Sequence, residues 1–254
     1  GLLFAILFIG EIMIFIILVI LLFIHLSKRK LTKKLIKEDV KKEVVEVVKP
    51  SRKNKVDYLV KVAIFATISS LLYTVPFLQF KLPFFPSFLE FQFSNLPAIL
   101  AGFILGPLGG SLVIIIKTIV KLPMSGTMFV GECADLIIGV SVVCITSLMY
   151  KKHRTLKGGA LSLLVGAVVW VGASLFANWA VLIRWYAHLF GGITTIVNVC
   201  KAVVPFITLD NFMIVYLSCC CLPFNSILAI VTMVVTFITY KSISKIFKKE
   251  FFKK

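Results

Sequence analysis

Two carboxylates, Glu132 and Asp135, are the most chemically suggestive pair in the sequence. They are three residues apart, so a helix places them on one face. There they could accept hydrogen bonds from the hydroxyl groups of a ligand. They could equally pair with Lys117 or Lys121 of the preceding apolar run, because an ionisable group in an apolar environment usually has a partner.

Two asparagines are the next candidates. Asn178 precedes Trp179, and Asn225 follows Phe224, each within a strongly apolar stretch. A side-chain amide carries both a donor and an acceptor, so it can bind the edge of a heterocycle that has imide and carbonyl groups. The alternative is a hydrogen bond to a neighbouring helix.

A loop with an aromatic side is predicted between residues 82 and 97. Its prolines exclude a continuous helix. Phe88, Phe91 and Phe93 alternate with polar neighbours, a pattern suited to stacking on a flat conjugated ring. An aromatic belt at a membrane surface is the competing interpretation.

The amino-acid composition indicates that most of the chain is surrounded by lipid and not by water. Hydrophobic residues make up 59% of the 254 positions and charged residues 15%, whereas soluble domains average about 45–50% and 25%. Several apolar runs approach the roughly 20 residues that a helix needs to cross a bilayer. The sequence therefore predicts an all-α membrane protein with several spans.

The formal net charge of +17 does not indicate a nucleic-acid partner, because the Lys and Arg residues form short flanks between apolar runs. Such flanks mark the cytoplasmic side of a membrane and contact anionic lipid headgroups. We therefore expect the lipid bilayer to be a partner and nucleic acid not to be one.

Four domains are predicted from the apolar runs. Residues 1–27 form an extra N-terminal transmembrane anchor, residues 28–57 a charged cytoplasmic linker, residues 58–247 a six-helix membrane domain and residues 248–254 a basic cytoplasmic tail. The six spans of the membrane domain are placed at 58–76, 94–106, 108–122, 129–150, 159–188 and 223–245.

Basic flanks then predict the topology. Lysines and Arg154 after the fourth span, and the lysines after the sixth, place both of these ends in the cytoplasm. The basic cluster directly after residues 2–26 places the N-terminus outside. The connections 77–93, 123–128 and 189–222 then lie on the outer side. Irregular backbone at membrane depth must pack in protein or line a cavity, so these connections predict a ligand cavity open to the outside.

Catalytic chemistry has little support in the sequence. His25, His153 and His188 are the only histidines, and the basic flanks place the first two on the opposite side of the membrane from the third. The printed sequence contains no GxxxxGK[ST] phosphate loop. Its six cysteines show no CxxC spacing and are predicted to pack as small apolar residues. We therefore expect a protein that is not an enzyme and that depends on a partner for energy.

Several motifs together resemble a known family. The segment from Phe88 to Gly110, then Gly131-Glu132, Ala177-Asn178-Trp179 and Leu222-Pro223-Phe224-Asn225, is similar to the riboflavin-binding S component of energy-coupling-factor (ECF) vitamin transporters. The order and spacing agree over about residues 58–247.

The resemblance implies a six-transmembrane-helix S-component fold, here preceded by one extra transmembrane helix. It implies a substrate-capture subunit in the cell membrane that binds riboflavin, or the related FMN, from outside. Such a subunit docks on a membrane coupling protein attached to two ATPase subunits. Riboflavin is then the transported ligand, and no cofactor is expected.

The resemblance also implies residue roles. Asn178 and Asn225 would contact the isoalloxazine ring, with the 82–93 loop closing over it. The candidate ligand-binding residues are Asn178, Asn225, Trp179, Leu89, Phe88, Phe91, Glu132, Gly131, Asp135 and Lys117. The candidate docking face for the coupling protein consists of Ala63, Ala66, Thr67 and Ser70, a small-residue pattern that also suits close helix contact in general.

Two departures from the family pattern leave other ligands open. Leu228 stands where a lysine is common, and Gly131-Glu132-Cys133-Ala134-Asp135 stands where Gly-Glu-Leu-Ala-Asn is usual. An S component for another vitamin, such as folate or thiamine, is therefore the first alternative. The second is a membrane-embedded enzyme, or an assembly protein whose polar groups only join helices.

Overall fold

The computed structural model describes residues 52–189 and 191–251. The predicted anchor at 1–27 lies outside the described residues, as does the linker up to residue 51. Within the described part the first helix, α2 (Arg52–Thr74), begins inside the predicted linker and not at residue 58.

Helices account for most of the described residues, and five helical stretches are long and apolar enough to cross a membrane. The first stretch is in α2, and the second combines α4 (Pro107–Lys121) with the short helix η2 (Leu122–Met124). The third is α5 (Val130–Lys152). The fourth runs through α6 (Leu156–Ala177), the π-helix η3 (Asn178–Leu182) and α7 (Ile183–Leu189). The fifth combines α9 (Phe212–Val215), the π-helix η4 (Tyr216–Cys221) and most of α10 (Leu222–Phe251).

The remaining predicted span, 94–106, corresponds to the short helix α3 (Asn95–Leu105). Its 11 residues extend about 17 Å, whereas a hydrocarbon core is about 30 Å thick. The position of this helix was predicted, and it is a shorter apolar helix than the other five stretches, so the expectation that it crosses the membrane stays a prediction.

The junction between α3 and α4 is a tight reversal, as the sequence predicts. Gly106 has a φ of +86°, a backbone conformation that favours glycine, and Pro107 opens α4 at its first position. Beyond the turn, a Cβ added to Gly110 would lie 2.7 Å from the carbonyl oxygen of Ala98. Glycine at this position therefore lets the two helices pack closely.

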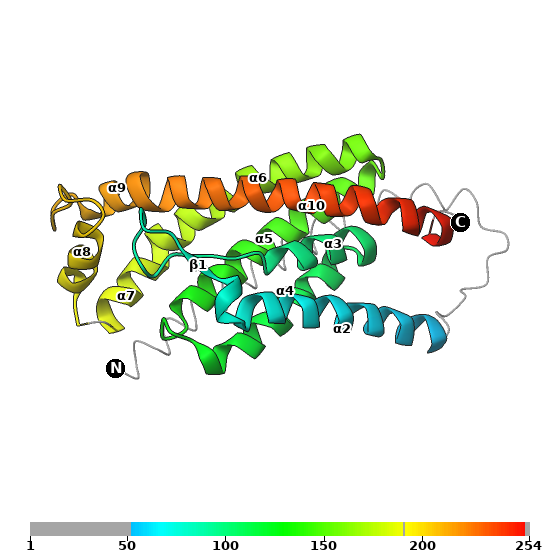
Figure 1. Ribbon diagram of the computed structural model, residues 1–254, viewed down its shortest axis with the longest axis horizontal. Coiled ribbons are helices and arrows are strands. Elements are labelled where there is room, and N and C mark those ends of the chain that lie inside the picture. The colour runs from blue at the N-terminus through cyan, green and yellow to red at the C-terminus, as the bar shows by residue number, and fades with distance from the viewer. Residues whose placement is uncertain (1–51, 190, 252–254) are drawn as a thin grey trace, which may run out of the picture. The chain divides into compact units, whose positions relative to one another are not determined.

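The core of the described part lies between five helices. α5 packs against α3, α4 and α6, while α10 packs against α6 and α3 (Figure 1). α2 joins this core through Val62 and Ala66. Large apolar side chains such as Ile64, Leu164 and Val168 remain exposed on the outer faces of the helices. Such apolar surface on long helices is suited to contact with lipid.

Short elements occupy the three connections that the sequence places on one side. In the first, η1 (Pro76–Leu78) precedes the antiparallel strands β1 (Phe80–Lys81) and β2 (Glu90–Phe91). The second contains η2, already described. In the third, α8 (Ile193–Lys201) lies beside α7 at one end of the helices (Figure 1). The two-residue strands are the one departure from an all-α fold within the described residues.

The last helical stretch begins earlier than predicted. Helical structure starts at Phe212, so residues 212–222 belong to this stretch and not to the outer connection. Pro223 cannot donate the usual backbone hydrogen bond within a helix. The π-helix η4 ends at Cys221, two residues before this proline, and the wider turn shifts the hydrogen-bond register there. The helical stretch thus continues through Pro223, the residue at which the sequence predicted that it would start.

Candidate ligand-binding site

A cavity of about 240 Å³ opens among the helices. Residues from each of the first two connections line it, among them Phe88, Glu90 and Gln92 from one and Gly126 and Thr127 from the other. The volume is slightly below the roughly 300–1,000 Å³ of pockets for drug-sized ligands. The cavity therefore has room for one small organic molecule.

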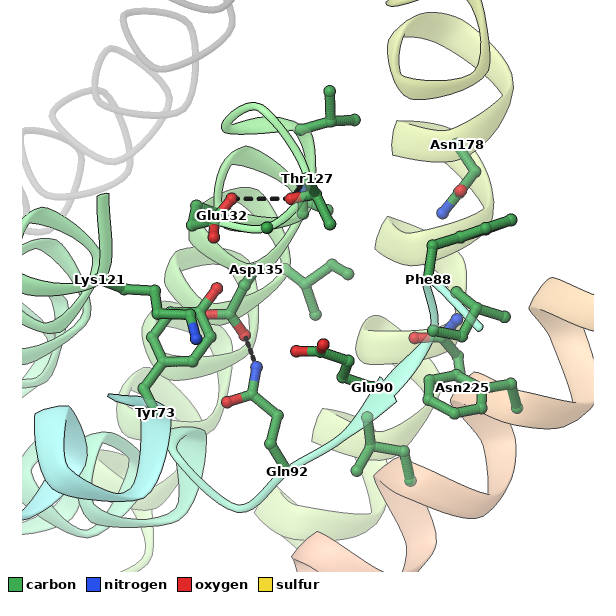
Figure 2. Close-up of a pocket in the computed structure, with 18 of the residues that line it drawn as sticks. Tyr73, Phe88, Glu90, Gln92, Lys121, Thr127, Glu132, Asp135, Asn178 and Asn225 are labelled. Atoms are coloured by element: carbon green, nitrogen blue, oxygen red, sulfur yellow. Dashed lines mark hydrogen bonds between the residues drawn. The ribbon is translucent and has the colours of Figure 1, made fainter. Parts of the chain in front are cut away.

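One side of the cavity carries amides and aromatic rings (Figure 2). We call this side the amide wall, and it consists of Asn178, Asn225, Phe88, Tyr216, Phe224 and Trp170. The opposite side carries ionised and polar groups. We call it the charged wall, and it consists of Tyr73, Gln92, Lys121, Thr127, Glu132 and Asp135.

The two asparagines of the amide wall are held in the same way. Each donates one Nδ2 hydrogen bond to the backbone carbonyl four residues earlier, at 2.8 Å for Asn178 and 2.9 Å for Asn225. The Oδ1 of Asn178 accepts from the Tyr216 hydroxyl at 3.0 Å, and that of Asn225 from the Trp170 indole at 3.3 Å. An amide has two N–H donors and two acceptor lone pairs. Each asparagine is therefore fixed in orientation. Asn178 keeps one donor and one acceptor for a ligand, whereas Asn225 keeps one acceptor and a second N–H that contacts only a weak acceptor, Cys221 Sγ, at 3.5 Å.

Both asparagines lie in or within about one turn of a π-helix. Asn178 is the first residue of η3, and η4 ends shortly before Asn225. The two π-helices contact each other. Single π-turns inside α-helices occur frequently at functional sites, because the extra residue per turn redirects nearby side chains.

The loop that contains β1 and β2 covers the cavity with its aromatic side. The ring of Phe88 lies 6.0 Å from that of Tyr216, centroid to centroid. Phe85 and Phe91 contact the Phe224 ring edge to face, at 5.3 Å and 6.4 Å. These contacts attach the loop to the last helical stretch, so the loop closes one side of the cavity.

Glu132 is buried in the charged wall, with 3% of its surface exposed. Its Oε2 accepts hydrogen bonds from the hydroxyls of Ser125, at 2.8 Å, and Thr127, at 3.0 Å (Figure 2). Ser125 in turn accepts from the backbone N–H of Phe129 at 2.9 Å. The turn before α5 therefore wraps around this carboxylate and fixes its direction.

That turn adopts a strained backbone conformation. Met128 and Phe129 have φ values of +48° and +71°, which non-glycine residues rarely adopt. Backbone strain of this kind persists where the surrounding structure over-determines it, and it is common at ligand sites. Here the hydrogen bonds around Glu132 supply that constraint.

Beneath the charged wall lies a buried ion pair. Lys117 is fully buried, and its ammonium lies 2.6 Å from Asp135 Oδ2. It also donates to Ser94 Oγ at 2.6 Å and to Asn95 Oδ1 at 2.7 Å. Asp135 Oδ1 accepts from Asn95 at 2.9 Å and, more weakly, from Gln92 at 3.4 Å (Figure 2). The pairing that the sequence left open for Asp135 is thus made with Lys117.

Most of the predicted ligand-binding residues line the cavity. Those that do are Asn178, Asn225, Leu89, Phe88, Glu132, Gly131 and Asp135. Lys117 lies behind Asp135 and outside the lining, and Phe91 packs against Phe93 and Phe224 instead. The proposed ligand-binding site therefore does not include Lys117 and Phe91.

Trp179 likewise does not line the cavity. Its side chain is 53% exposed and lies beside Phe176. Neighbouring residues of a helix point about 100° apart, so Trp179 cannot share the direction of Asn178.

The predicted docking face on α2 is divided. Ala63 and Thr67 are exposed, whereas Ala66 and Ser70 are buried, at 2% and 9% exposure. Ala66 belongs to the hydrophobic core. Only Ala63 and Thr67 are therefore available to a partner helix, and their docking role stays a prediction.

Several lining residues were not identified as ligand-binding from the sequence. Tyr73, Tyr216 and Trp170 look like ordinary apolar-span aromatics, and their spacing gives no separate signal. Gln92 lies in the aromatic loop, and its Oε1 is buried with no hydrogen-bond partner among the described residues. Lys121 was considered only as a partner for a carboxylate, although it lines the cavity itself. No group of three potential metal ligands occurs in residues 52–189 and 191–251.

Comparison with known proteins gives consistent findings. A family model described as "ECF transporter, substrate-specific component" matches residues 57–240. The riboflavin transporter FmnP of Bacillus subtilis (strain 168) is 31% identical over 134 residues, which cover 50% of this chain and 70% of FmnP. The riboflavin transporter RibU of Staphylococcus aureus (strain TCH60) is 26% identical over 182 residues, which cover 72% of this chain and 89% of RibU.

A solved structure shares the fold. The structure titled "Structure and mechanism of the S component of a bacterial ECF transporter" superposes with a TM-score of 0.58 at 24% sequence identity. The match covers 76% of this chain and 99% of the other. The prediction of an S-component membrane fold is thereby confirmed.

Proposed function

The chain belongs to the substrate-specific components of ECF transporters, and from this premise we propose that its cavity captures riboflavin for import. It is a multi-pass membrane protein, and its relatives are transporters and not enzymes. Riboflavin, or the related FMN, would be its transported ligand and not a cofactor.

The observation that carries this proposal is the amide wall. Asn178 and Asn225 are both buried, both fixed by internal hydrogen bonds, and both retain an acceptor; Asn178 also retains a donor, and the second N–H of Asn225 has only the weak acceptor Cys221 Sγ. The rings of Phe88 and Tyr216 stand beside them. A flat heterocycle with alternating donors and acceptors along its edge, such as isoalloxazine, matches this combination. Two relatives named riboflavin transporters support the same ligand.

A different vitamin, such as folate or thiamine, is the alternative, and Leu228 is the observation in its favour. This residue lines the cavity and is 5% exposed, so it presents an apolar surface where family members commonly carry a lysine. Without the lysine, the contact that it would make with the flavin ring is lost, and this loss would change either the affinity for riboflavin or the identity of the ligand.

We expect the purified chain in detergent to bind riboflavin with a Kd of about 1 µM or tighter, which corresponds to roughly 8 kcal/mol. Stacking on the aromatic rings should quench riboflavin fluorescence, and titration of the protein would measure it. Thiamine and folate in the same assay, read by equilibrium dialysis, are the comparison ligands. Tighter binding of either one, or no riboflavin binding in the micromolar range, would refute the riboflavin assignment.

Energy is proposed to come from partner subunits, namely a membrane coupling protein that carries two ATPase subunits. The support is family membership together with the exposed small residues of α2. Ala63 and Thr67 are one helical turn apart, and both are exposed. Small residues at this spacing let two helices in a membrane approach closely.

Replacing Ala63 with phenylalanine should abolish copurification with the coupling protein and leave riboflavin binding intact. The bulky ring prevents close approach at this surface, while the cavity lies elsewhere. Val168→Phe is a matched control, because Val168 is also exposed, but on α6. Intact complexes with Ala63→Phe would place the docking surface elsewhere.

The proposed orientation has the cavity open to the outside. α5 runs from Val130 beside the cavity to Lys151 and Lys152 at its other end, where Arg154 follows. Because basic residues concentrate on the cytoplasmic side, that end and the C-terminus are proposed to be cytoplasmic.

A further inference from the structure

We infer that Lys121 of the charged wall binds the hydroxyl-bearing chain of the ligand. This inference rests on the proposed function, because riboflavin joins a flat ring to a chain of hydroxyl groups. Lys121 lies at the end of α4, lines the cavity and is 8% exposed. Figure 2 shows its side chain beside the Tyr73 ring at the edge of the cavity.

The ammonium of Lys121 has only weak partners in the protein. Its hydrogen bond to Gln79 Oε1 is 3.5 Å long, and it lies 5.4 Å from the centre of the Tyr73 ring. Among the described residues no carboxylate lies at ion-pair distance from it. A charge removed from water needs close partners to offset the cost of desolvation. The contacts within the protein leave that cost largely uncompensated.

Lys117, one turn earlier on the same helix, shows what a satisfied lysine looks like in this protein. Its ammonium has three oxygen partners between 2.6 and 2.7 Å, one of them the carboxylate of Asp135. Lys117 does not line the cavity, whereas Lys121 does. The ammonium of Lys117 is therefore fully paired within the protein. The ammonium of Lys121 can still form close hydrogen bonds with a ligand.

Glu132 gives the charged wall a complementary group. Hydroxyl donors fix its Oε2, and no ammonium among the described residues lies at ion-pair distance from its carboxylate. The wall thus offers a cation that donates hydrogen bonds and an anion that accepts them. A hydroxyl group both donates and accepts, so a chain of hydroxyls can satisfy both charges at once.

The arrangement of the two walls sets the direction of the ligand. Figure 2 places Lys121, Tyr73 and Glu132 on one side and Asn178 and Asn225 on the other. With the ring against the amides, the hydroxyl chain extends toward Lys121. A terminal phosphate could also bind an ammonium, but the carboxylate of Glu132 in the same wall repels a dianion. The hydroxyl groups are therefore the assigned partners of Lys121.

The test compares Lys121→Met with the wild type for two ligands. Lumiflavin has the same ring as riboflavin but carries a methyl group in place of the hydroxyl chain. Loss of a charge-assisted hydrogen bond should weaken riboflavin binding by about 10- to 100-fold. Lumiflavin binding should stay within about threefold of wild type. Lys157→Met, at an exposed position at the start of α6, is the control and should bind both ligands like the wild type.

Methionine is chosen because it is similar in length and apolar, and because Lys121 has no carboxylate at ion-pair distance among the described residues, so its replacement leaves no buried anion without a cation. A second measurement needs no variant. In the wild type, riboflavin should protect Lys121 from reductive methylation more strongly than lumiflavin does, as read by peptide mass spectrometry.

Two results would overturn the inference while leaving the proposed function standing. They are unchanged riboflavin binding by Lys121→Met and an equal loss for riboflavin and lumiflavin. Equal protection of Lys121 by both ligands would likewise count against it. Wild-type protein that binds no flavin would instead refute the proposed function, and the inference with it.

Discussion

Alanine at Asn178 or at Asn225 is expected to weaken riboflavin binding by about 1–3 kcal/mol each, or roughly 5- to 150-fold in Kd. Each amide has one acceptor left after its internal hydrogen bonds, and each has a second N–H that is unused in Asn178 and only weakly bonded, to Cys221 Sγ, in Asn225. Removal of the amide leaves the ring edge of the bound flavin without a partner in a buried site. Fluorescence titration of each variant would measure the loss.

The expectation needs a control for general effects of asparagine removal. Asn198→Ala on α8 removes an exposed asparagine outside the cavity lining and should leave Kd unchanged. Trp179→Ala should also have little effect, because its ring lies outside the lining and is half exposed. Wild-type affinity in both Asn178→Ala and Asn225→Ala would mean that the amide wall does not bind the ring.

Loss of Lys117 is expected to have the largest effect on stability. Lys117→Met leaves the carboxylate of Asp135 buried without its cation, which typically costs about 3–5 kcal/mol. Asp135→Asn removes the stranded charge, so the double variant should be more stable than Lys117→Met alone. Thermal unfolding in detergent, followed by circular dichroism, would rank the three variants.

An exposed ion pair on α2 provides the matched control. Lys61 and Asp57 are also 2.6 Å apart, but 26% and 61% of their side-chain surfaces are exposed. Water screens such a pair, so Lys61→Met should cost less than about 1 kcal/mol. Equal destabilisation by Lys117→Met and Lys61→Met would contradict the idea that burial makes the inner pair essential.

The helices could be predicted from the sequence because lipid imposes a simple rule. Every backbone polar group at membrane depth must be paired within its segment, so long apolar runs become helices. The turn at Gly106-Pro107 and the basic residues after Tyr150 then divide the runs. Each of the six predicted spans corresponds to helical structure in the described residues.

The ends of helices were harder to predict, because packing can override local signals. Pro223 indicated a helix start, but η4 lets the helix begin at Phe212. A π-turn depends on contacts with a neighbouring helix, here between η3 and η4, and leaves no pattern in the sequence. The same contacts bring Tyr216 to Asn178.

The site was predicted where a residue type stands out from its surroundings. Asn178, Asn225, Glu132 and Asp135 are polar groups within apolar runs, and all four line the cavity. The contrast between Lys117 and Lys121 could not be predicted, because both are lysines four residues apart on one helix. Only the side chains of Ser94, Asn95 and Asp135 around Lys117 distinguish them.

The shortness of α3 has a consequence for how far a captured molecule must travel. Lys117 lies about 15 Å along α4 from Pro107, at 1.5 Å per residue, and it bonds to Ser94 and Asn95 at the start of α3. In the proposed orientation, with Pro107 at the cytoplasmic boundary of the membrane, that level is roughly midway through a hydrocarbon layer about 30 Å thick. A ligand resting on Gln92 and Asp135 would then have passed about half of the lipid barrier, and release would require a path through the remaining half only.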